Sequence, residues 1–545
     1  MSIHRFQVGL TAALACLATL AFAHSHGDGD AWTATEFPLS SAFAPTPLPD
    51  RVVLTWSDDP TTTQSVTWRT DTSIKHGVGE IALASANGRA METTRFGATL
   101  QAFESDVNEA HYHTLTFRNL EPDTLYAYRV GDGVNWTEFY QFKTASTRPT
   151  PFRFVYFGDA QNDVRTHWSR VFREAFRDAP RAAFMLHAGD LINENTRDVE
   201  WGEWHGAAGW VNGTIPIIAT PGNHEYFREN QGPRNERIWT RKDGSSIPVD
   251  VQASPIKGAT GTAGYDLKVT TPDGDEARMA VDGGGVILEV DEAMAAMTGF
   301  TAEELVGTKS YKAPLLDRLR NPGSTPVVSK HWRPQFEFPV QDVPRGLEET
   351  VYYIDYQGTR FISLDSNRDI QAQVPWLRKT LENNPNRWTV LTFHHPVFSP
   401  TLDRDNAELR AAWKPLIDEF RVDLVLTGHD HTYARTGIRD AESMSSAEAA
   451  TNIPSGYQQA YDPEIGTVYV VSVSGPKMYP VGKTNFARRV AENTQLYQVI
   501  DIADGALEYR AYTPKGELYD AFTLEKREGA ANRLLEALPP ERRGS

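Results

Sequence analysis

Five short apolar segments of this chain each end in a small cluster of Asp, Asn or His, and this repeated pairing constrains the fold more than any other feature. Between them lie stretches with the apolar spacing of helices, such as residues 165–176 and 404–420. Short apolar strands that alternate with helices are typical of an α/β layered domain. The sequence therefore predicts an α/β domain over residues 150–524, with the clusters at the carboxyl ends of its strands, where ligand sites of such domains lie. The apolar segments are 154–157, 183–186, 215–219, 388–393 and 422–426.

The polar clusters have the composition of a metal site. Carboxylate, amide oxygen and imidazole suit Fe, Mn, Zn or Mg rather than soft metals. One carboxylate can bridge two such ions about 3.5–4 Å apart, and such a pair lowers the pKa of a bridging water, so that no side-chain nucleophile is required. The clusters are Gly158-Asp159, Gly189-Asp190, Gly222-Asn223-His224-Glu225, His394-His395 and Gly428-His429-Asp430-His431.

Each cluster taken alone has an ordinary structural explanation. A Gly-Asp pair after a strand is usually a turn, Asn-His after Gly is often a cap, and two adjacent histidines can be buried core residues. All five clusters in one chain, each at the end of a strand, favour a shared site much more strongly than any single cluster does.

As a set, these motifs resemble those of the calcineurin-like metallophosphoesterases, and most closely the purple acid phosphatases. The resemblance covers most of residues 46–524 and implies a four-layer β-sandwich core flanked by helices. It implies that His224 contacts phosphate and acts as a general acid, and that His395, beside a ligand, supports the site or contacts substrate. The implied metal ligands are Asp159 and His431 for the first ion, Asn223, His394 and His429 for the second, and Asp190 as the bridge between them.

Two positions depart from the family pattern. Purple acid phosphatases carry a metal-binding tyrosine three residues after the bridging Asp, where this chain has Asn193. Other branches place a histidine two residues after the first Asp, where this chain has Gln161. Either amide could supply an oxygen ligand, so both stay open as additional or supporting ligands. The missing tyrosine predicts a colourless protein, without the visible tyrosinate–iron absorption band.

Residues 46–146 predict a separate all-β domain. Short apolar strands at 51–56, 65–69, 113–117 and 125–130 are separated by polar turns, which is typical of a β-sandwich. Pro122-Asp123-Thr124 resembles a fibronectin type III turn, and the family resemblance includes such a domain before the catalytic one.

The N-terminus has the pattern of an export signal. A basic start at Arg5 precedes the uncharged apolar stretch 8–22, and Ala21-Phe22-Ala23 offers small residues for cleavage. The stretch is too short to cross a bilayer, which needs about 20 residues. We expect a periplasmic or secreted protein with a flexible leader at 24–45. Its only cysteine, Cys16, lies in the signal, so the mature chain would hold no disulfide and no thiolate metal site.

Residues 232–330 interrupt the α/β pattern. Residues 241–251 resemble the late strands of a PAS sensory domain and 285–307 resemble its beginning, so the halves stand in swapped order, as in a circular permutation. A family-specific loop with a hairpin and one helix is the alternative. Residues 460–524 return to strands, and 525–545 predict a charged amphipathic helix as a solvated C-terminal tail.

The net charge of −17 argues against nucleic acid or an anionic membrane as the main partner. We expect a small phosphorylated substrate, whose charge bound cations would have to offset. Hydrolysis of phosphomonoesters by metal-bound hydroxide, as in acid phosphatases, is the favoured function. A phosphodiesterase of the same superfamily is one alternative, and an exported ligand-sensing protein with a vestigial metal site is another. Trp201, Trp204 and Trp210 are either pocket walls or core packing.

Overall fold

The computed structural model divides the chain into two compact units, residues 1–44 and 45–545. It describes residues 38–228, 236–240, 246–258, 261–271, 275–282, 287–306, 326–402, 404–438, 454–537 and 539. The predicted signal and most of the leader lie outside these residues, and α1 (Leu39–Ala42) is the element described in the first unit. In the described part of the chain, no helix is both long and apolar enough to cross a membrane.

The domain that begins at β1 is an all-β sandwich, as predicted. Its two four-stranded sheets have the orders β1-β2-β6-β5 and β4-β3-β7-β8. Trp68, Phe117 and Tyr128 are fully buried in its core. The four strands expected from the sequence correspond to β1, β2, β6 and β7. The strands are β1 (Asp50–Thr55), β2 (Gln64–Thr70), β3 (Val78–Leu83), β4 (Thr94–Gly97), β5 (Thr99–Glu104), β6 (Glu109–Phe117), β7 (Leu125–Gly131) and β8 (Tyr140–Lys143).

The second domain is built on two seven-stranded sheets. The first has the order β11-β10-β9-β26-β27-β28-β29, with β9 (Phe152–Phe157), β10 (Met185–His187), β11 (Ile217–Ala219), β26 (Tyr497–Ile502), β27 (Ala506–Tyr512), β28 (Leu518–Glu525) and β29 (Arg533–Glu536). The second has the order β19-β20-β21-β22-β24-β23-β25, with β19 (Tyr352–Tyr356), β20 (Thr359–Ser363), β21 (Trp388–Thr392), β22 (Leu424–Thr427), β23 (Tyr433–Arg435), β24 (Val468–Val471) and β25 (Arg489–Ala491).

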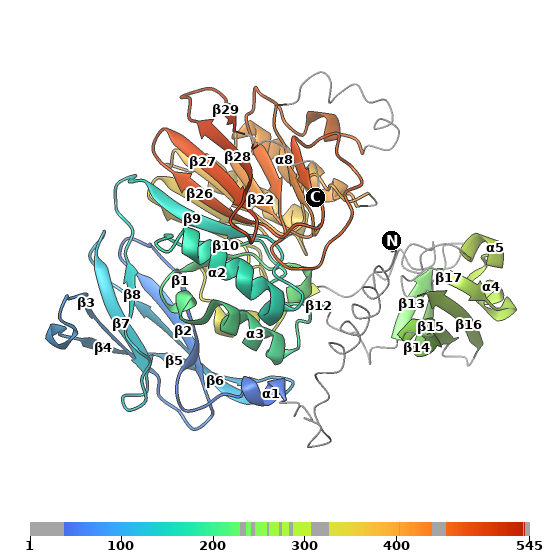
Figure 1. The fold of residues 1–545 in the computed structure, drawn as a ribbon, viewed down its shortest axis with the longest axis horizontal. Coiled ribbons are helices and arrows are strands. Elements are labelled where there is room, and N and C mark those ends of the chain that lie inside the picture. Colours follow the sequence, from blue (N-terminus) through green and yellow to red (C-terminus); the bar gives the residue numbers. More distant parts are fainter. Residues whose placement is uncertain are drawn as a thin grey trace, which may run out of the picture. The chain divides into compact units, whose positions relative to one another are not determined.

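Side chains that alternate along each strand build four layers, which confirms the predicted fold class. Phe361 and Val390 of the second sheet share a core with Phe154 of the first sheet. Their neighbours Ile362 and Leu391 face the other way, into a core formed with α7 (Val374–Glu382) and α8 (Ala407–Glu419). Helix α2 (Ser169–Asp178) lies beside β9 and β10 in Figure 1, and α3 (Asp198–Ala208) packs against α2.

The central strands of both sheets are parallel, and this places the site. Strands β9, β10 and β11 run parallel in one sheet, and β20, β21, β22 and β24 run parallel in the other. An isolated parallel bridge between Asp159 and Val473 joins the strand ends of the two sheets. The loops that follow these strands therefore meet at one edge of the sandwich.

The insertion forms a sheet of its own. Strands β12 (Tyr226–Arg228) and β18 (Pro326–Val328) pair antiparallel, so the two ends of the insertion lie side by side. Between them, the antiparallel strands follow the order β13-β14-β15-β16-β17, accompanied by α4 (Glu292–Thr298) and α5 (Ala302–Leu305). This is more than a hairpin with one helix, and the PAS-like assignment stays a prediction. The strands are β13 (Glu236–Thr240), β14 (Ser246–Gly258), β15 (Gly261–Thr270), β16 (Glu276–Asp282) and β17 (Ile287–Val290).

The prediction of an amphipathic helix over 525–545 is wrong for the residues that the structure describes. Residues 533–536 form β29, which pairs with β28 at the edge of the first sheet. Leu534 is buried in the main core, and Glu536 pairs with the buried Arg435 at 2.8 Å. These long-range contacts outweigh local helix propensity, which is a weak determinant on its own.

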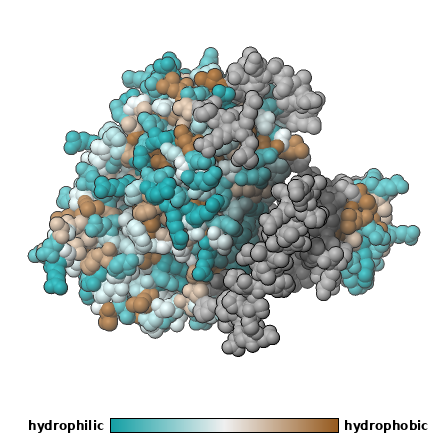
Figure 2. Space-filling model, in the orientation of Figure 1, coloured by the Kyte–Doolittle hydropathy of each residue, from teal (hydrophilic) through white to brown (hydrophobic). Residues whose placement is uncertain are grey.

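The molecular face in Figure 2 is mostly hydrophilic, and its hydrophobic residues form small separate patches. This agrees with the high negative charge of the chain. Scattered apolar side chains are normal on the surface of globular proteins and do not mark a site.

Candidate metal centre

The six predicted metal ligands come together at the edge where the two sheets meet. Asp159, Asp190 and Asn223 follow β9, β10 and β11 of the first sheet. His394 follows β21, and His429 and His431 follow β22 of the second sheet. Ligand atoms of Asp190, His394 and His429 lie within 4.8 Å of one another, as do those of Asp159, Asp190 and His431. Asp190 belongs to both groups, the position expected of a bridging ligand.

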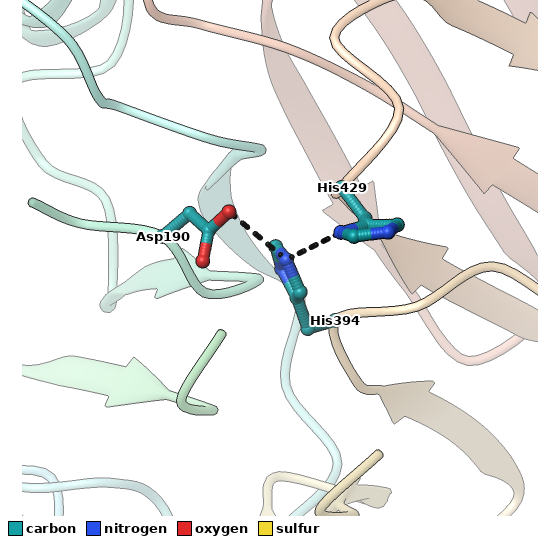
Figure 3. Close-up of side chains that lie close together, drawn as sticks. All are labelled: Asp190, His394 and His429. Atoms are coloured by element: carbon teal, nitrogen blue, oxygen red, sulfur yellow. Dashed lines mark hydrogen bonds and ion pairs between the residues drawn. The ribbon is translucent and has the colours of Figure 1, made fainter. Parts of the chain in front are cut away.

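One group surrounds the Nε2 atom of His394. Its Nδ1 donates a hydrogen bond to the carbonyl oxygen of Ala188 at 2.9 Å, which leaves Nε2 as the ligand atom. Figure 3 shows His394 between Asp190 and His429. Asp190 Oδ2, Asn223 Oδ1 and His429 Nδ1 each lie 3.1 Å from Nε2 of His394.

This convergence of lone pairs is suited to a cation. A carboxylate oxygen, an amide oxygen and neutral imidazole nitrogens all present electron density to the same small volume. Burial by itself lowers the pKa of His394, but the carboxylates of Asp190 and Asp159 outweigh it and raise that pKa to about 9, so a cation at this position would replace the proton on Nε2. Burial and the neighbouring histidines hold the pKa of His429 well below its usual range, which keeps its imidazole in the neutral, ligating form.

The second group contains Asp159, Asp190, His431 and also Gln161. The Nδ1 atom of His431 donates to the carbonyl oxygen of Lys477 at 2.8 Å, so its Nε2 faces the centre. The side-chain nitrogen of Gln161 lies 2.9 Å from Asp190 Oδ2 and 3.1 Å from His431 Nε2. Asp159 Oδ2 and Gln161 Oε1 are buried and have no hydrogen-bond partner among the described residues. Orphaned oxygens of this kind fit a second cation position.

The two departures from the family pattern have different surroundings. Gln161 is fully buried within the second group of ligands. Asn193 has a different partner, since its Oδ1 accepts a hydrogen bond from Asn162 Nδ2 at 2.5 Å. Its backbone carbonyl instead accepts from Nδ1 of His224 at 2.5 Å, which orients that imidazole.

The backbone is strained at three of the ligands. Asp190, His429 and His431 have φ values of 51°, 76° and 48°, in the left-handed region that non-glycine residues seldom occupy. Such strain persists where the surrounding structure enforces it, often at functional sites. Gly222 is required for space, because a Cβ atom there would lie 2.1 Å from Asp190 Oδ1.

Glu225 is a site residue whose role sequence reasoning missed. Its fully buried carboxylate accepts hydrogen bonds from the backbone N–H groups of Asp190, Leu191, Ile192 and Gly222 at 2.7 to 3.3 Å. It therefore fixes both the loop after β10 and the loop after β11. The sequence marks the position of Glu225, because this residue ends the Gly222-Asn223-His224-Glu225 motif. Its hydrogen-bond partners in the loop after β10 can be identified only from the structure.

The two predicted catalytic histidines flank the ligand cluster. The backbone N–H of His224 donates to Asp190 Oδ1 at 2.9 Å. His395 is held by Ser366, whose hydroxyl contacts its Nδ1 at 2.9 Å and accepts from its backbone N–H at 3.0 Å. Its ring lies 4.1 Å from that of His429, and burial lowers the pKa of His395 to about 3. His395 is therefore a neutral imidazole beside the centre.

A pocket of about 810 Å³ opens beside this cluster. Asn223 and His395 line it, together with Tyr226, Asn367 and the first residues of α8. Its volume is within the range typical of small-molecule sites. The tryptophans considered as pocket walls are not among its lining residues. Trp201 and Trp204 are fully buried in the main core, and Trp210 is 54% exposed.

Two facing sheets with this Asp, Asn and His cluster at their strand ends define a metallophosphoesterase fold, which implies a dinuclear metal centre. The α/β part of the chain matches the calcineurin-like phosphoesterase family, and the β-sandwich before it matches the purple acid phosphatase N-terminal domain. The model of that N-terminal domain matches residues 49–144, and the calcineurin-like phosphoesterase model matches 152–275 and 315–433.

Similar proteins agree with this assignment. The chain is 27% identical over 173 residues to acid phosphatase type 7 of Danio rerio, covering 30% of this chain and 36% of that protein. It is 25% identical over 142 residues to probable inactive purple acid phosphatase 1 of Arabidopsis thaliana, covering 22% and 23%. The chain thus spans well under half the length of these curated relatives.

Solved structures share the fold. Purple acid phosphatase PPD1 from yellow lupin superposes with a TM-score of 0.55 at 15% identity, covering 88% of this chain and 75% of that chain. PhoD superposes with a TM-score of 0.53 at 11% identity, covering 94% and 95%.

Proposed function

We propose that this protein hydrolyses phosphate esters, primarily phosphomonoesters, at a dinuclear metal centre. The observation that carries the proposal is the convergence of Asp190, Asn223 and His429 on the Nε2 atom of His394. When bound, a pair of cations lowers the pKa of water and withdraws charge from the phosphoryl group. The six predicted ligands would hold the pair, with Asp190 between the two positions.

The chain's own residues supply the remaining functions. His224 would contact the phosphate and protonate the leaving oxygen. The hydrogen bond that orients its ring on the Asn193 carbonyl supports this role. His395 lines the pocket as a neutral imidazole and can donate to a substrate oxygen. Export, with cleavage after Ala23, belongs to the same proposal, and the N-terminal residue of the secreted protein tests it.

The test combines metal analysis with hydrolysis assays. The purified protein is stripped with a chelator, reloaded separately with Mn²⁺, Zn²⁺, Mg²⁺ or iron, and assayed on p-nitrophenyl phosphate and bis(p-nitrophenyl) phosphate. We expect two ions per chain and faster cleavage of the monoester. Faster cleavage of the diester would favour the phosphodiesterase alternative. Failure to bind two ions or to cleave either ester would leave the ligand-sensing alternative.

We also propose that Gln161 is a ligand of the first ion and that Asn193 is not. Rotation about the last side-chain bond of Gln161 exchanges its nitrogen and oxygen, which brings an amide oxygen toward the position between Asp190 and His431. A cation bound there favours the oxygen, because an N–H donor would be repelled. The orphaned state of Gln161 Oε1 supports this orientation.

Metal stoichiometry distinguishes a ligand from a hydrogen-bond donor at this position. We expect Gln161→Leu to reduce the metal content from about two ions to about one per chain at limiting Mn²⁺. Gln161→Glu keeps an oxygen and should retain both ions, whereas Asn193→Leu should also retain both. Loss of one ion in Gln161→Glu would show that the amide N–H is what the site requires.

A further inference from the structure

Arg404 lies against both parts of the metal-binding loop after β22, and sequence reasoning did not single it out. Its Nη1 donates to the carbonyl oxygen of His429 at 2.7 Å and to Asp430 Oδ1 at 3.0 Å. Its guanidinium carbon lies 4.9 Å from the ring centre of Tyr479, and that ring lies 4.6 Å from the ring of His431. Arg404 is thus joined to one predicted ligand of each metal position.

Most N–H groups of the Arg404 guanidinium make no hydrogen bond within the described residues. A guanidinium has five N–H donors, and the hydrogen bonds of Arg404 within the described residues use only Nη1. The side chain is 31% exposed, so part of it is open to solvent. By contrast, both terminal nitrogens of Arg410 donate hydrogen bonds to the Asp405 carboxylate, at 2.5 and 3.1 Å. Within the described residues, Arg404 therefore has unused donors of the kind that a substrate contact requires.

Two lysines lie close to Arg404 or to the Tyr479 ring that it contacts. The buried carboxylate of Asp430 pairs with Arg404, but Lys483 also lies nearby and donates to the Arg404 carbonyl oxygen. Lys477 lies 5.6 Å from the Tyr479 ring. The described lining of the adjacent pocket includes Glu194, Asp405 and Glu408 but no Lys or Arg. In a chain of net charge −17, these three cationic side chains are a local source of positive charge for an anionic substrate.

We propose that Arg404 binds a non-bridging oxygen of the substrate's phosphoryl group, with Tyr479 as the positioning residue that supports the guanidinium plane. The planar guanidinium matches phosphate oxygens in geometry and forms strong charge-assisted hydrogen bonds with them. Stacking on the Tyr479 ring limits its rotation and reduces the entropy lost on binding. This role rests on the proposed phosphoesterase function.

Arg404→Gln tests the contact through inorganic phosphate, which needs no turnover. Calorimetric titration of the Mn²⁺-loaded protein with phosphate should show binding weakened about 10- to 100-fold, as expected for loss of a hydrogen bond to a charged group. The metal content should stay unchanged. Arg404→Lys should recover part of the affinity because it restores the charge. The control Arg378→Gln removes an exposed arginine that pairs with Glu419, and phosphate binding should be unaffected.

The competing explanation is that Arg404 serves only as the counter-ion of Asp430. In that case Arg404→Gln would lose metal or unfold, while Arg404→Lys would bind phosphate as tightly as the wild type, and either result would overturn the proposal. Tyr479→Leu provides a second variant, with metal retained and phosphate affinity reduced several-fold. A wild-type protein that binds neither two ions nor phosphate would instead refute the phosphoesterase function.

Discussion

Asp190→Ala should remove both metal ions and lower phosphate-ester hydrolysis by on the order of 10³-fold or more, because one carboxylate contributes to both positions. Asp190 is fully buried and lies 3.1 Å from His394, and both predicted ligand groups include it. Loss of any other ligand would affect mainly one position. Metal content after dialysis at limiting Mn²⁺ and initial rates on p-nitrophenyl phosphate measure the two effects together.

Thermal unfolding provides an independent measure of metal binding by the same variant. Metal that binds only the folded state raises the melting temperature, so the wild type should be stabilised by added Mn²⁺. Asp190→Ala should lose most of this increase, while Asp342→Ala, which changes an exposed carboxylate, should keep it. If Asp190→Ala still binds two ions and retains the full increase, the bridging role is wrong.

The convergence of the six predicted ligands could be expected from the sequence because their positions follow a local rule. Asp159, Asp190 and Asn223 each stand directly after a short apolar strand, and parallel strands place such residues at one edge. The same rule predicted His394, which follows β21, and the two histidines that follow β22. Each of these positions is recognisable without knowledge of how the two sheets face each other.

The supporting residues could not be predicted, since their roles depend on contacts between distant segments. Arg404 precedes α8 and looks like an ordinary surface residue until the fold places it against His429. The proposal that Gln161 rather than Asn193 is a ligand depends on which amide contacts Asp190 and His431, which the sequence does not show. The C-terminal strand β29 was missed for a related reason, because its pairing with β28 and its contact with Arg435 override a helix-like local pattern.

Glu225→Ala should destabilise the protein by several kcal/mol and also weaken metal binding. The variant leaves four backbone N–H groups without an acceptor in a fully buried site, and each such loss costs about 1–3 kcal/mol. These N–H groups belong to the loops that carry Asp190 and Asn223, so the ligand atoms would lose their fixed positions. Urea unfolding of the metal-free protein measures the first effect, and Mn²⁺ titration measures the second.

Glu225→Gln separates shape from charge at the same position. The amide keeps one acceptor oxygen, but its NH₂ group opposes N–H donors on the other side, such as those of Asp190 and Gly222 bound to Oε2 in the wild type. We expect a folded protein whose metal affinity is reduced about 10- to 100-fold, as for other residues that support metal ligands. Glu382→Gln, on the exposed side of α7, is the control and should match the wild type. Wild-type stability and metal affinity in both Glu225 variants would mean that the two loops hold the ligands without this carboxylate.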